Sequence, residues 1–474
     1  MKNTSRKITA VTGAVIIFYT GIIIAWHIYS PDRSIEMQNP GADNRPPETA
    51  RKTDDVRIGE FFMRYEQTTS QLTGKWIRFR GESSSNIVRT SDNISIGQDD
   101  YPVLWGVETG EGHAACVIYN GFVFFLDYDE LLSSDMLRCF SLETGAEQWR
   151  RWYRVPMKRN HGFSRTVPVI ADDYIITLGP QGHLMCCNPV TGDLLWTKDI
   201  QKEYKTEVPF WYAGQCPRVD DGVLVLATAG EDVLLTGINC LTGETVWETP
   251  NTLKYKMSHS SVMLMSLHGK KTYVYAGIGG VCGVSAEKED CGKLLWDASK
   301  WQPSVIAPSP LQLSSSNIFL VAGYGAGGAL LKIGYQGNKW TATITEQYKA
   351  NEGLSSEQQT PILYNDMIIS ILPKDGGSMR GKLTAYLPSD VHHPIWSSGA
   401  EERFGLGPYL VINNHVFVFK EDGELYVYEI KGHSMQLKKK QRIMEGADAW
   451  GNMAYADGRL IVRDAHNVKC IKLN

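Results

Sequence analysis

The sequence contains no CxxC pair and no long run of basic residues. Its nine cysteines are scattered singly, apart from the adjacent Cys186 and Cys187, and this spacing argues against a zinc site. The formal net charge is −4, which gives no electrostatic reason to expect nucleic-acid binding. Charged residues make up 21% of the chain and hydrophobic residues 43%, so we expect a folded protein with a sizeable core.

An apolar stretch of 21 residues, 8–28, carries no Asp, Glu, Lys or Arg. At about 1.5 Å per residue, a helix of this length spans a hydrocarbon core of about 30 Å. Lys2, Arg6 and Lys7 precede it, so the positive-inside rule places residues 1–7 in the cytoplasm and the rest of the chain outside. We predict an uncleaved single-pass membrane anchor, with the remainder of the chain outside the cytoplasm. The alternative is a cleaved signal peptide. Signal peptides typically have a shorter apolar run followed by an A-x-A cleavage site, and no such site follows this stretch.

The anchor is followed by a region, residues 29–75, that we interpret as a linker. Residues 30–55 are polar and rich in proline, a composition typical of a flexible tether. Within the linker, residues 58–72 have the pattern of a short amphipathic helix. Residues 76–474 then form the folded domain.

A repeated unit recurs through that domain: an alternating apolar strand, then Thr-Gly, three residues and a tryptophan. The clear copies are TGAEQW (144–149), TGDLLW (191–196) and TGETVW (242–247), and the variants are CGKLLW (291–296), QGNKW (336–340) and the segment ending at Trp396. The tryptophans Trp149, Trp196, Trp247, Trp296, Trp340 and Trp396 are 47, 51, 49, 44 and 56 residues apart. A period near 50 with several short strands per period predicts the blades of an all-β propeller.

The turn glycine and the tryptophan have separate expected roles. A tight turn between the last two strands of a blade needs a residue at positive φ, which glycine adopts without strain. The tryptophan then begins the outermost strand, where its large apolar face fills the gap between neighbouring blades.

Closing the ring determines the number of blades. Trp105 precedes the first complete unit by 44 residues, and the C-terminal strands have no tryptophan unit after them. We therefore expect the C-terminal strands to pair with the strand around Trp105, which leaves no open sheet edge. A further unit ends near Leu437, so the prediction is eight blades, with seven as the alternative.

These residues resemble the PQQ-like (quinoprotein-type) β-propeller repeat family, and within it the exported bacterial proteins related to BamB. The motif WIRFRG (76–81) is similar to the W-x-x-F-R-G start of that family. The resemblance covers roughly residues 76–474 and implies the fold. It does not decide the function, because the family includes both quinone-dependent dehydrogenases and non-catalytic scaffolds.

A dehydrogenase of this family would hold PQQ with Ca²⁺, and often covers it with a ring formed by two adjacent disulfide-bonded cysteines. Cys186 and Cys187 are the only adjacent pair. They lie in a strand, where neighbouring side chains point to opposite faces. We therefore expect two ordinary buried thiols, no catalytic residue, no metal site and no cofactor, and keep a PQQ-dependent enzyme as an alternative.

Polar segments precede the innermost strands of several blades, where propellers bind ligands at the mouth of the central channel. The candidate ligand- or partner-binding residues are His161, Arg165, Trp211, His259, Gln358, Gln359, Arg403 and Trp450. Aromatic residues would supply anchors, and arginine would supply directed hydrogen bonds. The competing interpretation is that these side chains only bond to one another and to channel carbonyls.

Together with this resemblance, these features predict a non-catalytic scaffold that is anchored in a bacterial inner membrane by a single pass, with the propeller in the periplasm. Its resemblance to BamB-like proteins implies a partner among envelope or outer-membrane assembly proteins. A sensor of a small ligand or glycan at the channel mouth is a further alternative.

Overall fold

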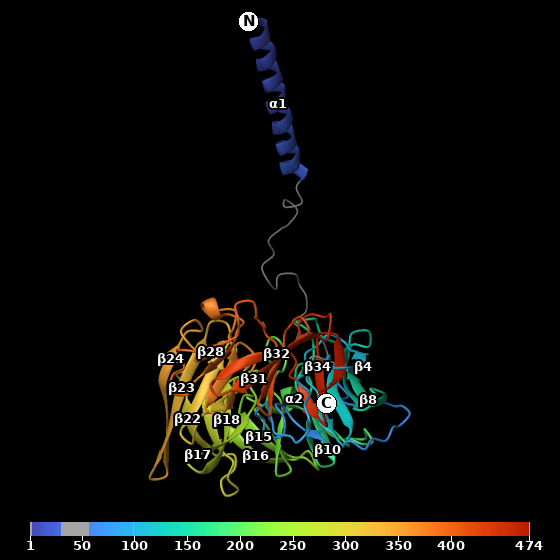
Figure 1. Cartoon of the computed structure of the whole chain (residues 1–474), viewed down its shortest axis with the longest axis vertical. Helices are drawn as coiled ribbons and strands as arrows, with labels where there is room; N and C mark the ends of the chain where they lie inside the picture. Colours follow the sequence, from blue (N-terminus) through green and yellow to red (C-terminus); the bar gives the residue numbers. More distant parts are fainter. Residues whose placement is uncertain (1, 30–55, 98, 474) are drawn as a thin grey trace. The chain divides into compact units, whose positions relative to one another are not determined.

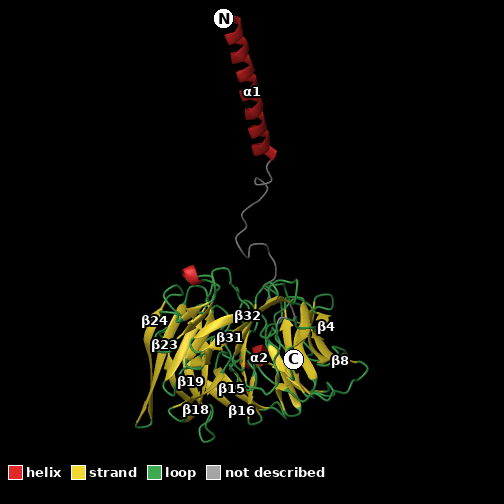
Figure 2. Cartoon of the chain, viewed as in Figure 1, coloured by secondary structure: helices red, strands yellow, loops and turns green. Residues whose placement is uncertain are grey.

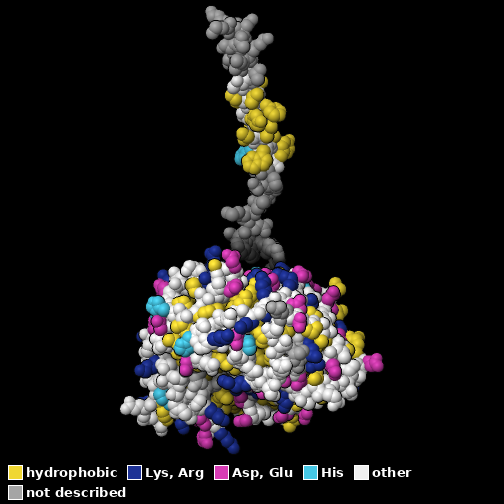
Figure 3. Space-filling view, in the orientation of Figure 1, with side chains coloured by type: hydrophobic (Ala, Val, Ile, Leu, Met, Phe, Trp, Pro, Cys, Tyr) yellow, Lys and Arg dark blue, Asp and Glu magenta, His cyan; other side chains and the backbone are white. Residues whose placement is uncertain are grey.

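The computed structural model describes residues 2–29, 56–97 and 99–473. The chain divides into two compact units, Met1–Asp55 and Val56–Asn474. In the first unit, helix α1 (Lys2–Tyr29) contains an apolar window, Thr12–Tyr29, with a mean hydropathy of 1.6. Figure 3 shows hydrophobic side chains gathered along it. The helix includes the predicted span 8–28 and could cross a membrane. The predicted tether 30–55 lies outside the described residues.

The second unit is built from eight β-sheets, which form the blades of a ring. Figures 1 and 2 show this unit as strands joined by loops. Listed from the innermost strand outward, blade 1 contains β5 (Val117–Tyr119), β6 (Phe122–Asp129), β7 (Ser134–Ser141) and β8 (Glu147–Arg154). Blade 2 contains β9 (Val169–Ala171), β10 (Tyr174–Leu178), β11 (His183–Cys187) and β12 (Leu194–Asp199). Blade 3 contains β13 (Arg218–Asp220), β14 (Val223–Leu226), β15 (Val233–Asn239) and β16 (Thr245–Pro250). Blade 4 contains β17 (Met263–Leu267), β18 (Lys270–Gly277), β19 (Gly280–Ser285) and β20 (Leu294–Ala298).

The second half of the ring repeats the same order. Blade 5 contains β21 (Leu311–Gln312), β22 (Asn317–Ala322), β23 (Gly327–Gln336) and β24 (Lys339–Tyr348). Blade 6 contains β25 (Ile362–Tyr364), β26 (Met367–Ile371), β27 (Leu383–Tyr386) and β28 (Trp396–Ser397). Blade 7 contains β29 (Tyr409–Ile412), β30 (His415–Phe419), β31 (Glu424–Lys431) and β32 (Ser434–Arg442). Blade 8 contains β33 (Ala454–Ala456), β34 (Arg459–Arg463), β35 (Asn467–Lys472) and β4 (Val103–Glu108).

The ring therefore has eight blades, as predicted, and not seven. Two short helices accompany the strands: α2 (Ile200–Tyr204) follows β12, and a single 3₁₀ turn (Gly377–Met379) lies between β26 and β27. The four strands of a blade alternate in direction, so successive connections between strands lie at opposite ends of the ring. We call the end where the innermost strands begin the loop face, and the end that carries the Thr-Gly turns the turn face.

The two ends of the propeller sequence meet in blade 8. Strand β4 pairs antiparallel with β35, with Trp105 opposite Cys470. This is the closure that the sequence predicted. It removes the two free edges that the first and last strands would otherwise expose.

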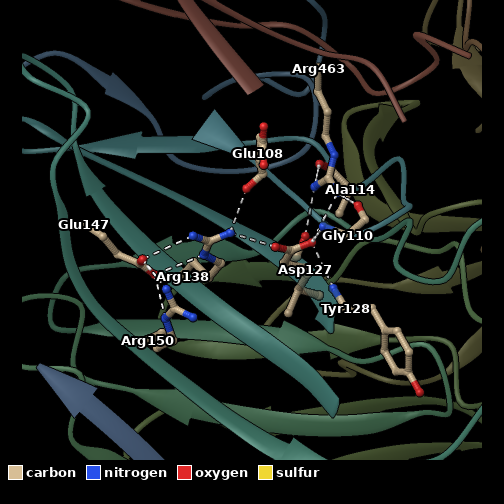
Figure 4. Close-up of polar contacts among 10 residues, drawn as sticks. Glu108, Gly110, Ala114, Asp127, Tyr128, Arg138, Glu147, Arg150 and Arg463 are labelled. Atoms are coloured by element: carbon tan, nitrogen blue, oxygen red, sulfur yellow. Dashed lines mark hydrogen bonds and ion pairs between the residues drawn. The ribbon is translucent and has the colours of Figure 1, made fainter. Parts of the chain in front are cut away.

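A buried polar network joins blade 8 to blade 1 beside this closure (Figure 4). Arg463 of β34 donates from Nη1 to the carbonyl oxygens of Ala114 and Leu126, both at 2.9 Å, and its Nη2 lies 3.7 Å from Asp127 Oδ1. Asp127 Oδ2 accepts from Arg138 Nη1 at 2.9 Å, and Arg138 also pairs with Glu147. Asp127 is thus the carboxylate shared by two buried guanidinium groups.

Neighbouring blades are joined by the predicted tryptophans. The indole Nε1 of Trp105, Trp149 and Trp196 donates to the backbone oxygen of Leu142, Pro189 and Cys240 in the following blade. Each acceptor lies three residues before a turn glycine at positive φ: Gly145, Gly192 and Gly243. A Cβ added to these glycines would lie 2.6, 2.8 and 2.8 Å from the preceding blade's indole, respectively. The glycine therefore provides both the turn and the surface on which the indole packs.

Most of these tryptophans also face a small residue on their own blade. The cross-strand partner is Cys139 for Trp149, Cys186 for Trp196, Gly237 for Trp247, Gly283 for Trp296, Ala385 for Trp396 and Cys470 for Trp105. A small partner leaves room for the indole. This explains why several cysteines recur in third strands.

Trp340 departs from this arrangement. Its turn is one residue shorter, and Trp340 pairs with Tyr335, with the ring centroids 4.5 Å apart. The ring centroid of His268 in blade 4 lies 6.2 Å from that of Trp340. The indole of Trp340 therefore contacts the preceding blade.

The helix predicted for residues 58–72 is wrong. Residues Phe61–Arg64 form strand β1, which pairs antiparallel with the outer edge of β8. Phe61 stacks on Trp152 at 5.6 Å, and Phe62 contacts Trp149 at 6.4 Å. Pairing with an open sheet edge outweighs a weak local helical pattern. The part of the chain predicted as a linker thus contributes to blade 1.

We predict that Gly192→Ala destabilises the propeller more than Gly222→Ala. Both glycines have nearly the same φ, +74° and +75°, but a Cβ meets Phe62 and Trp149 only at Gly192. The backbone strain of about 1–2 kcal/mol is therefore common to both variants. The clash should add about 1–3 kcal/mol for Gly192→Ala. Urea unfolding measures the difference, and equal losses would show that the indole does not rely on this glycine.

We also predict that Asp127→Ala lowers the free energy of unfolding by about 3–5 kcal/mol, because it leaves two buried guanidinium groups without their shared carboxylate. The matched control is Asp193→Ala, whose exposed carboxylate lies 4.0 Å from Arg64. That variant should lose at most about 1 kcal/mol. Chemical unfolding of the three proteins checks this, and a small loss for Asp127→Ala would contradict it.

Candidate functional site

One end of the central channel is closed by residues 75–88, which we call the plug. Strand β2 (Lys75–Trp76) pairs with β5 of blade 1, and β3 (Ile87–Val88) runs parallel to β29 of blade 7. Between them, Ile77 O accepts from Ile170 N of blade 2 at 2.8 Å. The plug enters from the turn face, because Lys75 lies opposite Tyr119, the last residue of β5.

Arginines secure the plug to blades further round the ring. Arg78 Nη1 donates to Val219 O of blade 3, and Arg80 Nη2 donates to Pro361 O just before β25 of blade 6, both at 3.0 Å. Burial lowers the pKa of Arg80 to about 10. The WIRFRG motif thus supplies groups that cross the channel.

Above the plug, a pocket of about 310 Å³ opens at the loop face. Phe79 of the plug lies in its lining, and segments leading into the innermost strands of all eight blades supply the walls. The pocket therefore lies on the axis of the ring. Its apolar lining residues are Phe79, Ala115, Val167, Cys216, Val305, Ala307 and Leu406.

The pocket brings together seven of the eight residues selected from the sequence: His161, Arg165, Trp211, His259, Gln358, Gln359 and Trp450. Arg403 does not line it. Its guanidinium donates to the backbone oxygens of Arg380 and Ser378 and so binds the loop between β26 and β27. Whether the seven residues bind a ligand remains a prediction.

Other lining residues were missed. They are Phe79, His113, Tyr324, Glu357, Lys374 and Asn452. Tyr324 lies in the glycine-rich GYGAGG turn between β22 and β23, and Lys374 lies in the polar loop LPKDGGSMRG after β26. Both come from loops between the second and third strands of a blade. These loops reach the same face as the segments before the innermost strands.

Aromatic side chains from separate blades meet at the mouth. Trp211 stacks on Tyr324 at 5.7 Å between ring centroids and 14° between planes, and Phe210 packs edge-on against Trp211 at 5.6 Å. His113 stacks on Trp450 at 4.3 Å. These pairs give the pocket flat apolar walls around polar groups.

The pocket lining carries two cations and one carboxylate. Lys374 Nζ lies 3.3 Å from Glu357 Oε1 and 4.8 Å from the Tyr324 ring centroid. The Arg165 guanidinium donates to four backbone oxygens of its own loop, those of residues 160–163, and pairs with no carboxylate among the described residues. Burial lowers the pKa of Arg165 to about 10. The lining thus holds one positive charge in excess.

Two buried histidines are held neutral. Burial, together with the nearby Arg165 charge, lowers the pKa of His113 to about 3 and that of His259 to about 4. Several buried lining atoms also have no hydrogen-bond partner among the described residues: His113 Nδ1, His259 Nδ1, Glu357 Oε2 and Trp450 Nε1. Unpaired buried polar atoms are costly and are common where a ligand or water binds.

The residues present do not fit a Ca²⁺-held quinone. Ca²⁺ takes about six to eight oxygen ligands, mainly carboxylates and carbonyls. The described lining supplies one carboxylate, Glu357, which is already paired with Lys374. No group of three or more His, Cys, Asp or Glu residues suited to a metal occurs among the described residues.

Cys186 and Cys187 likewise match the expected buried thiols. Both are free and fully buried on strand β11. Cys186 packs in the core between blades 2 and 3, and Cys187 in the core between blades 1 and 2. Burial raises the pKa of the Cys187 thiol to about 12, which makes it unreactive.

An eight-bladed ring with Thr-Gly-x-x-x-Trp turns and one plugged channel end defines a PQQ-like β-propeller. The family model for the outer membrane protein assembly factor BamB matches residues 133–390, more than half of the chain. The chain belongs to this family. No curated protein sequence matches it.

Solved structures with a similar fold include a BamB protein and two dehydrogenases. BamB from Moraxella catarrhalis is 12% identical with a TM-score of 0.50, covering 79% of this chain and 98% of that one. A europium-containing methanol dehydrogenase is 11% identical with a TM-score of 0.55, covering 82% and 89%. The quinohemoprotein alcohol dehydrogenase from Comamonas testosteroni is 11% identical with a TM-score of 0.53, covering 84% and 80%. At these identities, the likeness shows the fold alone.

We predict that His259→Gln weakens the dependence of stability on pH. The unfolded chain takes up the His259 proton near pH 6.5, whereas the folded protein does so only near pH 4. The wild type therefore loses stability as the pH falls through this window. At pH 5, this histidine should account for about 1–2 kcal/mol of that loss. Urea unfolding at pH 7.5 and pH 5 measures it, and identical pH dependence in both proteins would contradict the assignment.

Proposed function

We propose that this protein is a non-catalytic, membrane-anchored scaffold of the bacterial periplasm that binds an envelope protein at its loop face. Membership of the BamB family supports a scaffolding or protein-interaction role. The apolar helix α1, preceded in sequence by Lys2, Arg6 and Lys7, supports anchoring with the propeller outside the cytoplasm.

The observation that carries the proposal is the aromatic cluster of Phe210, Trp211 and Tyr324 beside the pocket. Phe210 is 80% exposed and Tyr324 is 50% exposed. Contiguous exposed aromatic residues mark interaction sites, because tryptophan, tyrosine and arginine dominate binding energy at interfaces. Leu131, on the β6–β7 loop of the same face, is 98% exposed.

The turn face differs in this respect. Its exposed apolar residues include Val190, Leu194 and Leu195 in blade 2 and Leu241 and Val246 in blade 3, all of them aliphatic. None of these is an aromatic residue of the kind that dominates binding energy at interfaces. Charged side chains of both signs are interspersed over the side of the ring seen in Figure 3. The loop face therefore offers the better docking surface.

We predict that a photocrosslinking amino acid at position 210 captures a discrete envelope protein in living cells. The matched control places the same amino acid at position 241, which is exposed on the turn face. Trp211→Ala should reduce the yield of the adduct several-fold, because it removes the central anchor. Immunoblotting and mass spectrometry of the adducts provide the measurement.

Two results would contradict this function. One is equal capture from both positions, or none from position 210. The other is reduction of a dye by the purified protein when PQQ, Ca²⁺ and an alcohol or sugar are supplied, which would indicate a dehydrogenase.

A further inference from the structure

The channel pocket has a floor and only one mouth. Phe79 of the plug lines the bottom, and apolar side chains such as Val167, Val305 and Leu406 surround it. An extended polypeptide that enters such a pocket cannot leave at the far side. A polypeptide that enters it must therefore end there or turn back.

A second cavity, also of about 310 Å³, lies directly beside the first at the loop face. The two share Trp211, His259 and Val305 in their linings. The second cavity is further lined by Pro209, Phe210 and Met257. A chain whose end lies in the axial pocket can therefore continue outward past Trp211 along this apolar groove.

The charge of the axial pocket distinguishes the two ends of a polypeptide. Lys374 and Glu357 neutralise each other at 3.3 Å, whereas Arg165 has no carboxylate partner among the described residues. A partly buried cation without a carboxylate partner attracts an anionic ligand. An amino terminus would add a second unpaired positive charge, while a carboxyl terminus would neutralise the first.

We propose that the axial pocket binds the C-terminal residue of a partner protein, with its carboxylate near Arg165 and its apolar side chain on the Phe79 floor. The preceding residues of the partner lie in the adjacent groove against Trp211 and Phe210. Trp450 Nε1 is a buried donor without a partner that can meet the carboxylate. His113 Nδ1, His259 Nδ1 and Glu357 Oε2 are further buried lining atoms without partners, and Glu357 Oε2 can accept only from a donor such as the last peptide N–H. This assignment rests on the proposed scaffold function and names the part of the partner that binds.

The last described strand of the propeller does not lead into this pocket. Strand β35 runs towards the turn face, and Leu473 N donates to Gly458 O there. The plug closes the channel between that face and the pocket.

The test uses the full chain in detergent and a fluorescein-labelled octapeptide ending in Ala-Leu, with either a free carboxyl end or a C-terminal amide. Fluorescence anisotropy measures both dissociation constants. We expect the free acid to bind at least about tenfold more tightly than the amide, because the amide lacks the negative charge that the Arg165 guanidinium attracts. This comparison requires no change in the protein, so it does not depend on the folding of a variant.

Two matched variants locate the effect. Arg165→Gln should abolish the preference for the acid, whereas Arg403→Gln should keep it. Both arginines donate to backbone oxygens of loops on the same face, but only Arg165 lines the pocket. A third probe, 4-methylpentanoate, carries the carboxylate and the leucine-like group without a peptide. It should compete at least about tenfold more weakly than the peptide, because it makes no contacts in the groove.

Any of four results overturns the proposal: no binding of the acid peptide, equal binding of acid and amide, an acid preference retained in Arg165→Gln, or competition by 4-methylpentanoate as strong as that of the peptide. The last result would make the pocket a site for free acids. None of these four results changes the capture of a partner from position 210 that the scaffold function predicts. Failure of the C-terminus-binding proposal can therefore be distinguished from failure of the scaffold function.

Discussion

Pairing of β4 with β35 is the constraint on which the rest of the propeller depends. It joins the two ends of a chain of more than 350 residues, and the buried Arg463–Asp127 contact joins the closed blade to blade 1. Each blade is only four strands of partly apolar sheet, and it buries both faces only when both neighbours are present. The pocket needs the same closure, since segments before the innermost strands of all eight blades form its wall.

The plug depends on the closed ring in turn. Its hydrogen bonds reach blades 1, 2, 3, 6 and 7, so the correct partners exist only after these blades surround one axis. Arg80 illustrates this dependence, because its fully buried guanidinium would lose its partner at Pro361 if blade 6 were displaced. The N-terminal part of the domain is therefore a structural component of the channel and not a leader attached to it.

The periodic features of the fold were predictable because they recur. Turn glycines and tryptophans at a spacing near 50 indicated the blades, and the unpaired strand at Trp105 indicated the closure. Features that occur only once in the chain were not predictable. Strand β1 pairs with a sheet edge that exists only in the folded protein, and the local pattern of its residues suggested a helix instead. Seven pocket residues were found because they precede apolar strands, whereas Phe79 reaches the pocket from a distant segment and Tyr324 from a loop that looked like a simple turn. Arg403 follows the same pattern as the others, but its side chain turns to a neighbouring loop.

A propeller channel that is closed at one end forms a pocket and does not connect the two faces of the ring. A ligand must therefore leave the pocket through the opening by which it entered, and the water that it displaces leaves by the same route. Threading of a long chain, sliding along it and vectorial transfer from one rim to the other are all geometrically forbidden while Phe79 and its neighbours stay in place. Capture and release then both take place past the loops of a single face.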